Sequence, residues 1–241
     1  MNIQGIYHVW PENYQLIKDL GFTNAGLSSD YPQDHNLFLS CVKEAHNKGL
    51  HVIVAPKFYI FNKPAGIWVS NIPDAKQLLE KLKHDLCMRC LVYLPDEPNL
   101  SRSDMTPDVM LALHTLIRNI IPQCSTVMVL GWTRSYEGYQ NVSDIVGFDF
   151  YKPFWPDIWT TAKLIAKIKW FQMAHNGPLM AVPGIKYGAD HIKRQARFWK
   201  LLGIKDFFWY SFTPDMEVPK WFDKDLAGLT EIQKALLRAN Q

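Results

Sequence analysis

The chain has 241 residues, of which 48% are hydrophobic, and its formal net charge is +3 with both signs mixed along its length. This length suits one α/β barrel or two small domains, and the lack of a long basic run argues against a nucleic-acid partner. The chain does not open with a basic segment and an apolar core, and no apolar run could cross a bilayer. We therefore expect a soluble protein with no signal peptide and no membrane partner, in a compartment that the sequence leaves unknown.

Short runs rich in β-branched and aromatic residues alternate with segments whose apolar residues recur at helical spacing. The predicted strands are Ile3–Val9, Thr23–Leu27, His51–Ala55, Cys90–Leu94, Thr126–Leu130, Ile145–Phe150, Leu179–Val182 and Phe207–Tyr210. The predicted helices are Glu12–Leu20, His35–Lys48, Asp74–Cys87, Pro107–Ile121, Ile158–His175, Asp190–Leu202 and Asp225–Ala239. Only residues 133–143, between the fifth and sixth strands, form a connection too short for a full helix.

Strict alternation of strands and helices implies a parallel sheet with right-handed crossovers. Eight such units in this length fit a closed barrel better than an open sheet, and the glycine-rich nucleotide motifs that accompany open sheets are absent. No composition break or linker divides the chain. The sequence therefore predicts the α/β class, as a single-domain (β/α)8 TIM barrel over residues 1–241.

Polar and aromatic side chains follow the predicted strands, and the carboxyl ends of barrel strands meet at one mouth. The candidate binding residues there are His8, Trp10, Asp30, Tyr31, Lys57, Tyr59, Asp96, Asn99, Trp132, Arg134, Tyr151, Lys152 and Trp209. Aromatic faces suit the C–H patches of a sugar ring, while its hydroxyl groups need directional polar partners. These residues therefore predict a carbohydrate ligand, although Trp209 could equally belong to the core.

The segment Leu94–Asn99 places an acidic pair, Asp96 and Glu97, between two prolines at the end of the fourth strand. Pro98 biases the preceding residue towards an extended conformation, so we expect Glu97 to be held in a limited set of directions. Because side chains alternate along a strand, the two acids should not share a proton unless a bulge intervenes. This pattern predicts Glu97 as a catalytic acid and Asp96 as a residue that orients a hydroxyl or a neighbouring Arg or Lys.

Glycoside hydrolysis requires a second carboxyl group. Asp149 stands among apolar residues near the end of the sixth strand, where a buried carboxylate needs a partner or a function. It is the best candidate, although a structural bond to a tyrosine or lysine across the barrel explains it equally well. Asp30, Asp215 and Glu217 are weaker candidates, because acids in loops are usually only solvated.

Several motifs together carry a family resemblance that covers nearly the whole chain. They are Gly5–Val9 with Leu16–Asn24, Tyr93–Pro98, Asp144–Tyr151 and Gly203–Tyr210. The chain resembles the glycoside-hydrolase-like TIM barrels related to the clan of cellulases and β-galactosidases. In that clan Asn-Glu-Pro closes the fourth strand, so the resemblance implies that Glu97 is the general acid/base, with Asp96 in place of the asparagine.

The chain departs from that clan at the end of the seventh strand. The clan has its nucleophilic glutamate there, whereas the segment Leu179–Ile185 contains no acid. Either another carboxylate serves, with Asp149 favoured, or the barrel binds glycans without cleaving them. The sequence thus predicts a glycosidase, with a catalytically inactive glycan-binding or structural barrel as the alternative.

A third hypothesis is Schiff-base chemistry at Lys152, because its position after the sixth strand resembles that of the lysine in class I aldolases. A metal centre is a weaker prediction, since the pair Cys87 and Cys90 has no second pair and the histidines are scattered. We expect neither a cofactor nor a metal.

Overall fold

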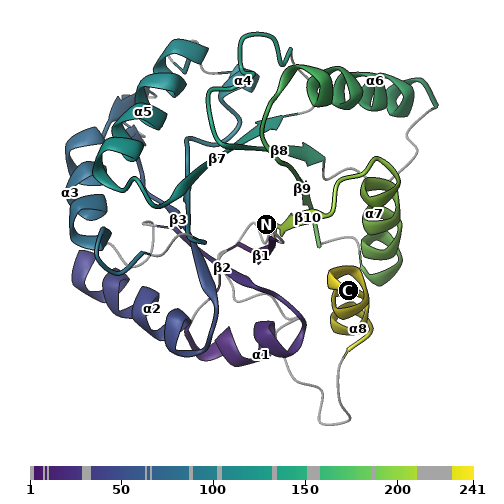
Figure 1. Ribbon diagram of the computed structural model, residues 1–241, viewed down its shortest axis with the longest axis horizontal. Coiled ribbons are helices and arrows are strands. Elements are labelled where there is room, and N and C mark those ends of the chain that lie inside the picture. The colour runs from purple at the N-terminus through teal and green to yellow at the C-terminus, as the bar shows by residue number, and fades with distance from the viewer. Residues whose placement is uncertain are drawn as a thin grey trace.

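In the computed structural model, eight parallel strands close into a barrel in the order β1-β10-β9-β8-β7-β6-β3-β2, with helices around the outside (Figure 1). The structure describes residues 3–7, 9, 11–28, 34–62, 64–65, 67–86, 89–101, 105–131, 135–150, 158–185, 188–210 and 230–241. The predicted TIM-barrel fold is confirmed.

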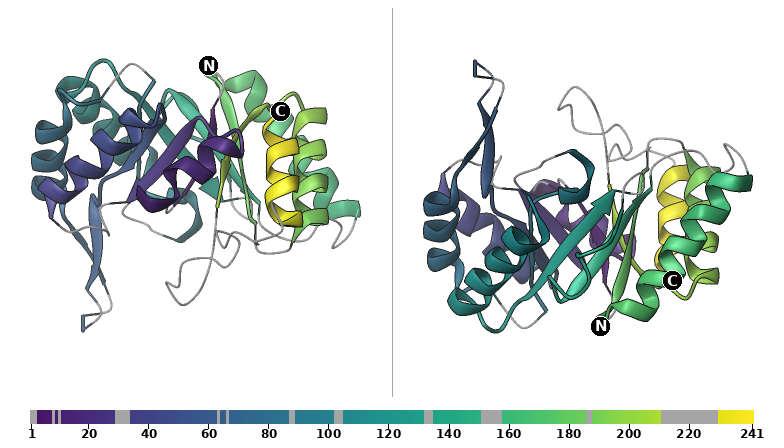
Figure 2. Two further views of the ribbon diagram at one scale, coloured as in Figure 1. Left: turned by 90° about the horizontal axis from the view of Figure 1, so that it is seen from below. Right: turned by 90° about the horizontal axis from the view of Figure 1, so that it is seen from above.

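The barrel strands coincide with the eight predicted strands to within a few residues. They are β1 Gln4–Ile6, β2 Asn24–Ser28, β3 His51–Ala55, β6 Leu91–Tyr93, β7 Ser125–Gly131, β8 Ile145–Phe150, β9 Leu179–Pro183 and β10 Asp206–Trp209. Two further strands, β4 Tyr59–Asn62 and β5 Ile67–Ser70, pair antiparallel. They form a hairpin that extends beyond the barrel and that the sequence did not predict (Figure 2).

The helices overlap the predicted segments, except the short α4, Pro98–Ser101, which the sequence did not predict. They are α1 Tyr14–Asp19 after the 3-10 turn η1 Pro11–Asn13, α2 His35–Asn47, α3 Ile72–Leu82, α4 Pro98–Ser101, α5 Pro107–Ile120, α6 Ile158–Ala174, α7 Ala189–Leu201 and α8 Glu231–Asn240. In the part of the chain that the structure describes, three helix starts carry a side-chain cap, from Asp34, Thr106 and Thr230. Such caps satisfy backbone N–H groups that have no partner inside the helix, and this fixes where the helix begins.

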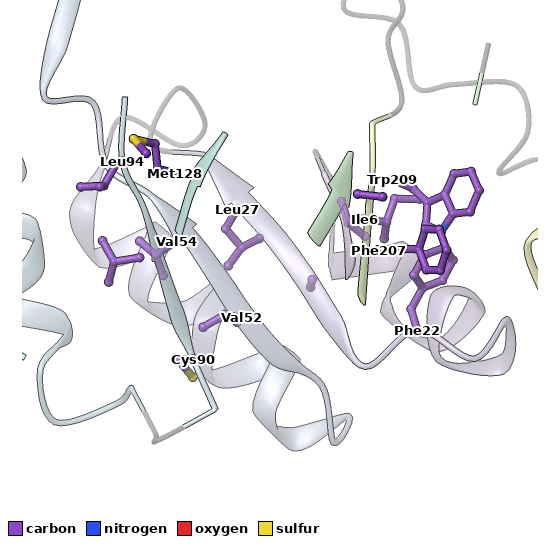
Figure 3. Close-up of a cluster of buried hydrophobic side chains, with 14 of the residues drawn as sticks. Ile6, Phe22, Leu27, Val52, Val54, Cys90, Leu94, Met128, Phe207 and Trp209 are labelled. Carbon is purple, nitrogen blue, oxygen red and sulfur yellow. The ribbon is translucent and has the colours of Figure 1, made fainter. Parts of the chain in front are cut away.

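Two hydrophobic clusters fill the inside and the outside of the barrel wall. The inner cluster includes Ile53, Val129 and Phe208, whereas Val54, Met128 and Phe207 belong to the outer cluster beneath the helices. Neighbouring residues of one strand thus serve different clusters, as the two-residue period of a strand requires. Figure 3 shows side chains of the outer cluster, among them Phe207 and Trp209.

Helices follow the other barrel strands, but the connection from β7 to β8 has none in its described part, residues 135–144. The short connection seen in the sequence explains this difference. At the end of the chain, α8 lies beside α7 in the ring (Figure 1). Asn240 of α8 accepts a hydrogen bond from Trp209 Nε1 at 3.2 Å and donates one to Leu20 O at 3.1 Å. The final helix therefore joins β10 to the end of α1.

Within the described residues, no helix has the length and the apolar character that crossing a membrane would require.

Candidate active site

The predicted site residues divide into those that the structure describes and those outside the described residues. The described ones are Lys57, Tyr59, Asp96, Glu97, Asn99, Asp149 and Trp209. Outside lie His8, Trp10, Asp30, Tyr31, Trp132, Arg134, Tyr151 and Lys152, as well as the loop acids Asp215 and Glu217. The site is therefore built from the first group and its neighbours.

Glu97 is placed by a bulge at the end of β6. Leu94 N donates to Val127 O at 2.8 Å, and Glu97 N donates to Val129 O at 3.1 Å. Between these two bonds the chain after β6 covers three residues and β7 covers two. The chain after β6 thus contains one extra residue, as in a β-bulge. The bulge changes the simple alternation predicted for Asp96 and Glu97.

The backbone of Glu97 has φ +44°, in the left-handed region. The expectation that Pro98 would hold this residue in an extended conformation is wrong. The bond to Val129 and the start of α4 at Pro98 together impose the turn. For a residue with a Cβ atom such a conformation costs about 1–2 kcal/mol, and strain of this kind is common at functional sites.

Asp96 is exposed and accepts a hydrogen bond of 2.7 Å from the hydroxyl group of Tyr93. Tyr93 belongs to the inner cluster, so this bond links Asp96 to the top of the barrel interior. Asn99 makes a two-way connection to the end of β7, since its Nδ2 donates to Gly131 O at 2.8 Å and its Oδ1 accepts from Gly131 N at 2.9 Å. Asn99 therefore fixes the strand end between Glu97 and β8.

Asp149 lies in β8, one residue before its end, and is in register with Gly131 of β7 and Val182 of β9. Its neighbours Phe148 and Phe150 belong to the outer cluster, so Asp149 faces the barrel interior. Only 2% of its surface is exposed. On the same face Gly147 lies between Val129 and Val182, where a Cβ atom would come within 3.0 Å of both side chains. The interior is thus closely packed next to Asp149.

Tyr210 responds to the charges of all three acids. Its backbone is held by the end of β9, because its N–H donates to Pro183 O at 2.9 Å and its carbonyl accepts from Ile185 N at 3.1 Å. Burial, followed by the nearby charges of Asp96, Asp149 and Glu97, raises the pKa of its hydroxyl group to about 12. At neutral pH this hydroxyl group is therefore protonated and lies within the field of all three acids.

Three tyrosines form a cluster around this point that the sequence did not predict. Tyr7 stacks on Tyr210 with ring centroids 5.5 Å apart, and its ring lies 6.1 Å from that of Tyr93. Tyr7 and Tyr210 each follow the last residue of a barrel strand. This position was the signal in the sequence that could have assigned both residues to the site. Single aromatic residues at such places are common in cores, which is why the signal was weak.

Two predicted binding residues pack in or against the outer cluster. Trp209 is fully buried in the outer cluster, where it stacks on Phe207 at 5.6 Å and donates to Asn240. Tyr59 lies at the start of β4 and packs against the same outer cluster. Strand alternation turns Trp209 outwards, so the core alternative holds for this residue and its assignment to ligand binding is withdrawn. A ligand contact of the half-buried Tyr59 stays a prediction.

The remaining predicted residue, Lys57, follows β3 and is half-buried; burial lowers the pKa of its ammonium group. Its carbonyl group accepts from Asn71 Nδ2 at 2.9 Å, which holds the base of the hairpin. Gly184 and Ile185, which follow the end of β9, are buried and carry no acid. The place where the clan carries its strand-seven glutamate is thus occupied by residues without a polar side chain.

A buried polar network supports the end of β8 next to Asp149. Gln195 of α7 accepts a 2.9 Å hydrogen bond from Trp199 Nε1 through its Oε1, so its Nε2 is the atom that donates to Phe150 O at 3.1 Å. The same Nε2 lies 3.0 Å from Nε2 of His191. An N–H group facing this nitrogen requires it to be an acceptor, so His191 is neutral here. Burial, followed by the charge of Arg194, lowers the pKa of His191.

Acidification should therefore destabilise the protein through His191. Its pKa in the folded state lies below the unfolded value of about 6.5. Between these two values the unfolded chain binds more protons, so the stabilisation present above about pH 6.5 is lost as the pH falls. We expect the free energy of unfolding, measured with urea at a series of pH values from about 7.5 to 5, to decrease. His191→Gln should show a shallower decrease, and an unchanged slope would contradict this role.

The matched control for this measurement is His84→Gln, because His84 is an exposed histidine. It should follow the wild-type curve. Both variants need a folded spectrum at neutral pH before their slopes are compared.

Comparison with known proteins identifies the fold. No family model and no curated protein sequence matches the chain. Among solved structures, a GH113 β-1,4-mannanase superposes with a TM-score of 0.70 at 10% identity, over 100% of this chain and 99% of the other. The β-galactosidase from the psychrophilic Marinomonas ef1 gives 0.68 at 10% identity, over 100% of this chain and 59% of that one.

A β-glucuronidase from Bacteroides uniformis superposes with a TM-score of 0.58 at 14% identity, over 88% of this chain. The match covers only 30% of that enzyme, so the chain corresponds to less than a third of its length. Identities this low show the fold alone, which is a (β/α)8 TIM barrel.

Proposed function

We propose that this chain, whose barrel has the glycoside-hydrolase fold, hydrolyses glycosidic bonds in an oligo- or polysaccharide. Glu97 acts as the general acid/base and Asp149 is the second carboxylate. The observation that supports this proposal most directly is that the charges of three acids, all near the carboxyl ends of barrel strands, raise the pKa of the Tyr210 hydroxyl group. This is the end of a TIM barrel at which active sites lie.

The arrangement of β6, β7 and β8 suits two acids with different tasks. Strands lie about 4.8 Å apart, so the backbones at Glu97 and Asp149 are separated by roughly 10 Å across β7. Two acids at such a separation can flank a sugar ring. Glu97 is half-exposed and can give its proton to the leaving oxygen. The buried Asp149 would stabilise positive charge at the anomeric carbon or activate the water that attacks this carbon.

The proposal is tested with aryl β-mannosides, glucosides, galactosides and glucuronides, together with β-linked oligosaccharides. We expect release of the aryl group from at least one of them by the wild-type chain. Proton NMR of the first sugar anomer formed then shows whether configuration is retained or inverted, which reports on how the second carboxylate acts. Absence of turnover across the panel would contradict hydrolysis.

A glycan-binding barrel without catalysis is the second candidate. It is favoured by the apolar end of β9, where the related clan carries its nucleophile. Isothermal titration with the same oligosaccharides distinguishes the two, because this candidate requires heat of binding without any release of product.

A further inference from the structure

A second aromatic surface lies on the outside of the barrel, along α6. Its exposed side chains Trp159, Ala162, Ala166, Trp170 and Met173 recur at intervals of three and four residues, so they share one face of the helix. We refer to these five residues as the α6 stripe. Trp159 is 73% exposed, Trp170 41% and Met173 81%. A solvent-facing helix surface is normally polar, so this stripe requires an explanation.

The missing crossover helix explains why one flank of α6 is accessible. In the described part of the connection between β7 and β8, residues 135–144 form no helix that could pack beside α6. Figure 1 shows α6 at the periphery of the ring, on the outer side of β8. The short segment Ser135–Glu137 lies against α6 instead.

A cavity of about 350 Å³ lies between this segment and the helix. It is lined by Ser135, Tyr136, Glu137, Ala166, Lys167 and Trp170. Lys167 covers the ring of Tyr136, with Nζ 5.3 Å from the ring centroid. Trp170 borders both the cavity and the α6 stripe, so the two form one continuous surface. The volume is within the range of about 300–1,000 Å³ that is usual for small-molecule sites.

The chemistry of this surface fits a sugar chain. Trp159 and Trp170 are three helical turns apart, or about 16 Å along the axis, with only alanines between them on the stripe. Two indole rings in line, separated by small side chains, offer flat apolar faces on which successive sugar rings can stack. Lys163 and Lys169 on both sides of the stripe, and the hydroxyl and carboxylate groups of Ser135 and Glu137, supply donors and acceptors for hydroxyl groups.

The charges favour a neutral chain over an anionic partner. The helix itself carries lysines and no acid, which alone would suit an anionic surface. Glu137, however, lines the same cavity as Lys167, and a carboxylate there would repel an anion while accepting hydrogen bonds from a sugar. The hollow shape beside Trp170 also suits a ligand that enters it more than a flat bilayer.

We propose that the α6 stripe and its cavity form an accessory binding site for a neutral β-linked polysaccharide. The proposal rests on the proposed function and adds to it a polymeric substrate. The site lies outside the barrel wall and is separate from the strand ends that hold Glu97 and Asp149. A polymer bound there is kept close to the mouth of the barrel, which raises its local concentration at the active site.

Affinity electrophoresis in gels that contain β-mannan or β-glucan tests this inference. All proteins carry Glu97→Gln so that the polymer is not digested. We expect the parent to be retarded in one of these gels. The double variant Trp159→Ala/Trp170→Ala should raise the dissociation constant by at least about tenfold, because it removes both aromatic faces. Trp170→Phe keeps a ring and should retain most of the binding.

Leu111→Ala is the matched control, because Leu111 is an exposed apolar residue on α5, away from the stripe. It should bind as the parent does. The inference is overturned if neither gel retards the parent, if the double variant is retarded equally, or if Trp159 and Trp170 mediate binding to phosphatidylglycerol vesicles instead. Circular dichroism checks that each variant is folded.

Failure of this inference and failure of the proposed function give different results. If only the accessory site is absent, the wild-type chain still cleaves aryl glycosides while the gels show no dependence on Trp159 and Trp170. If only hydrolysis is absent, the gels still show that dependence.

Discussion

Glu97→Gln is expected to lower kcat by about 10²- to 10⁴-fold, the usual contribution of a general acid/base. Glutamine keeps the size of the side chain but cannot give a proton to the glycosidic oxygen. The loss should be smaller for aryl glycosides whose leaving groups need little protonation than for oligosaccharides. Steady-state rates on one substrate of each kind measure the difference, and full turnover by this variant would exclude Glu97 from the mechanism.

Glu97→Gly is the informative companion variant. The left-handed φ of +44° strains any residue with a Cβ atom, and glycine adopts it freely. Both variants should be inactive, but the free energy of unfolding of Glu97→Gly should exceed that of Glu97→Gln by about 1 kcal/mol, because only glycine relieves the strain. Urea titration of the two proteins measures this. Equal stabilities would show that the backbone here is not strained.

Asp149→Asn should cause a second large loss, again about 10²- to 10⁴-fold in kcat, if Asp149 is the partner carboxylate. Asparagine preserves the shape of the side chain inside the closely packed barrel but removes its charge. Steady-state kinetics on the best aryl glycoside give the effect, and circular dichroism checks the fold. A variant with nearly wild-type turnover would assign Asp149 a structural role.

Tyr210→Phe serves as the control for an indirect effect. Burial and three carboxylates keep the Tyr210 hydroxyl group protonated, and Asp149 contributes to this through its charge. If Asp149 served only to orient Tyr210, the two variants would lose activity equally. We expect the loss in Tyr210→Phe to be clearly smaller, because a tyrosine that positions other groups takes no part in the bond that breaks.

Stability and catalysis should respond to different parts of the same strand. Phe150 is held through its carbonyl group by Gln195 of α7, in a network that requires neutral His191. The neighbouring residue Asp149 faces the opposite side of the barrel wall. A change at His191 should therefore alter acid stability, and a change at Asp149 should alter turnover.

The barrel was predictable because its signals are local. Eight apolar runs with a two-residue period and helices with a 3.6-residue period specify the order of the elements, and glycines such as Gly21 and Gly49, with φ +81° and +75°, end helices where only a residue without Cβ is unstrained. The hairpin β4–β5 escaped prediction because it lies within an insertion after β3, where strand propensity alone did not distinguish it from a loop.

The site was only partly predictable. The sequence by itself determined that an acidic pair ends the fourth barrel strand and that the seventh carries no acid, since both statements concern residues next to predicted strand ends. The tertiary structure decided the direction in which each side chain faces. A one-residue bulge gave Glu97 its left-handed turn, alternation buried Trp209 against Asn240, and barrel closure brought Tyr7, Tyr93 and Tyr210 together. These contacts join residues far apart in the chain, and no local pattern encodes them.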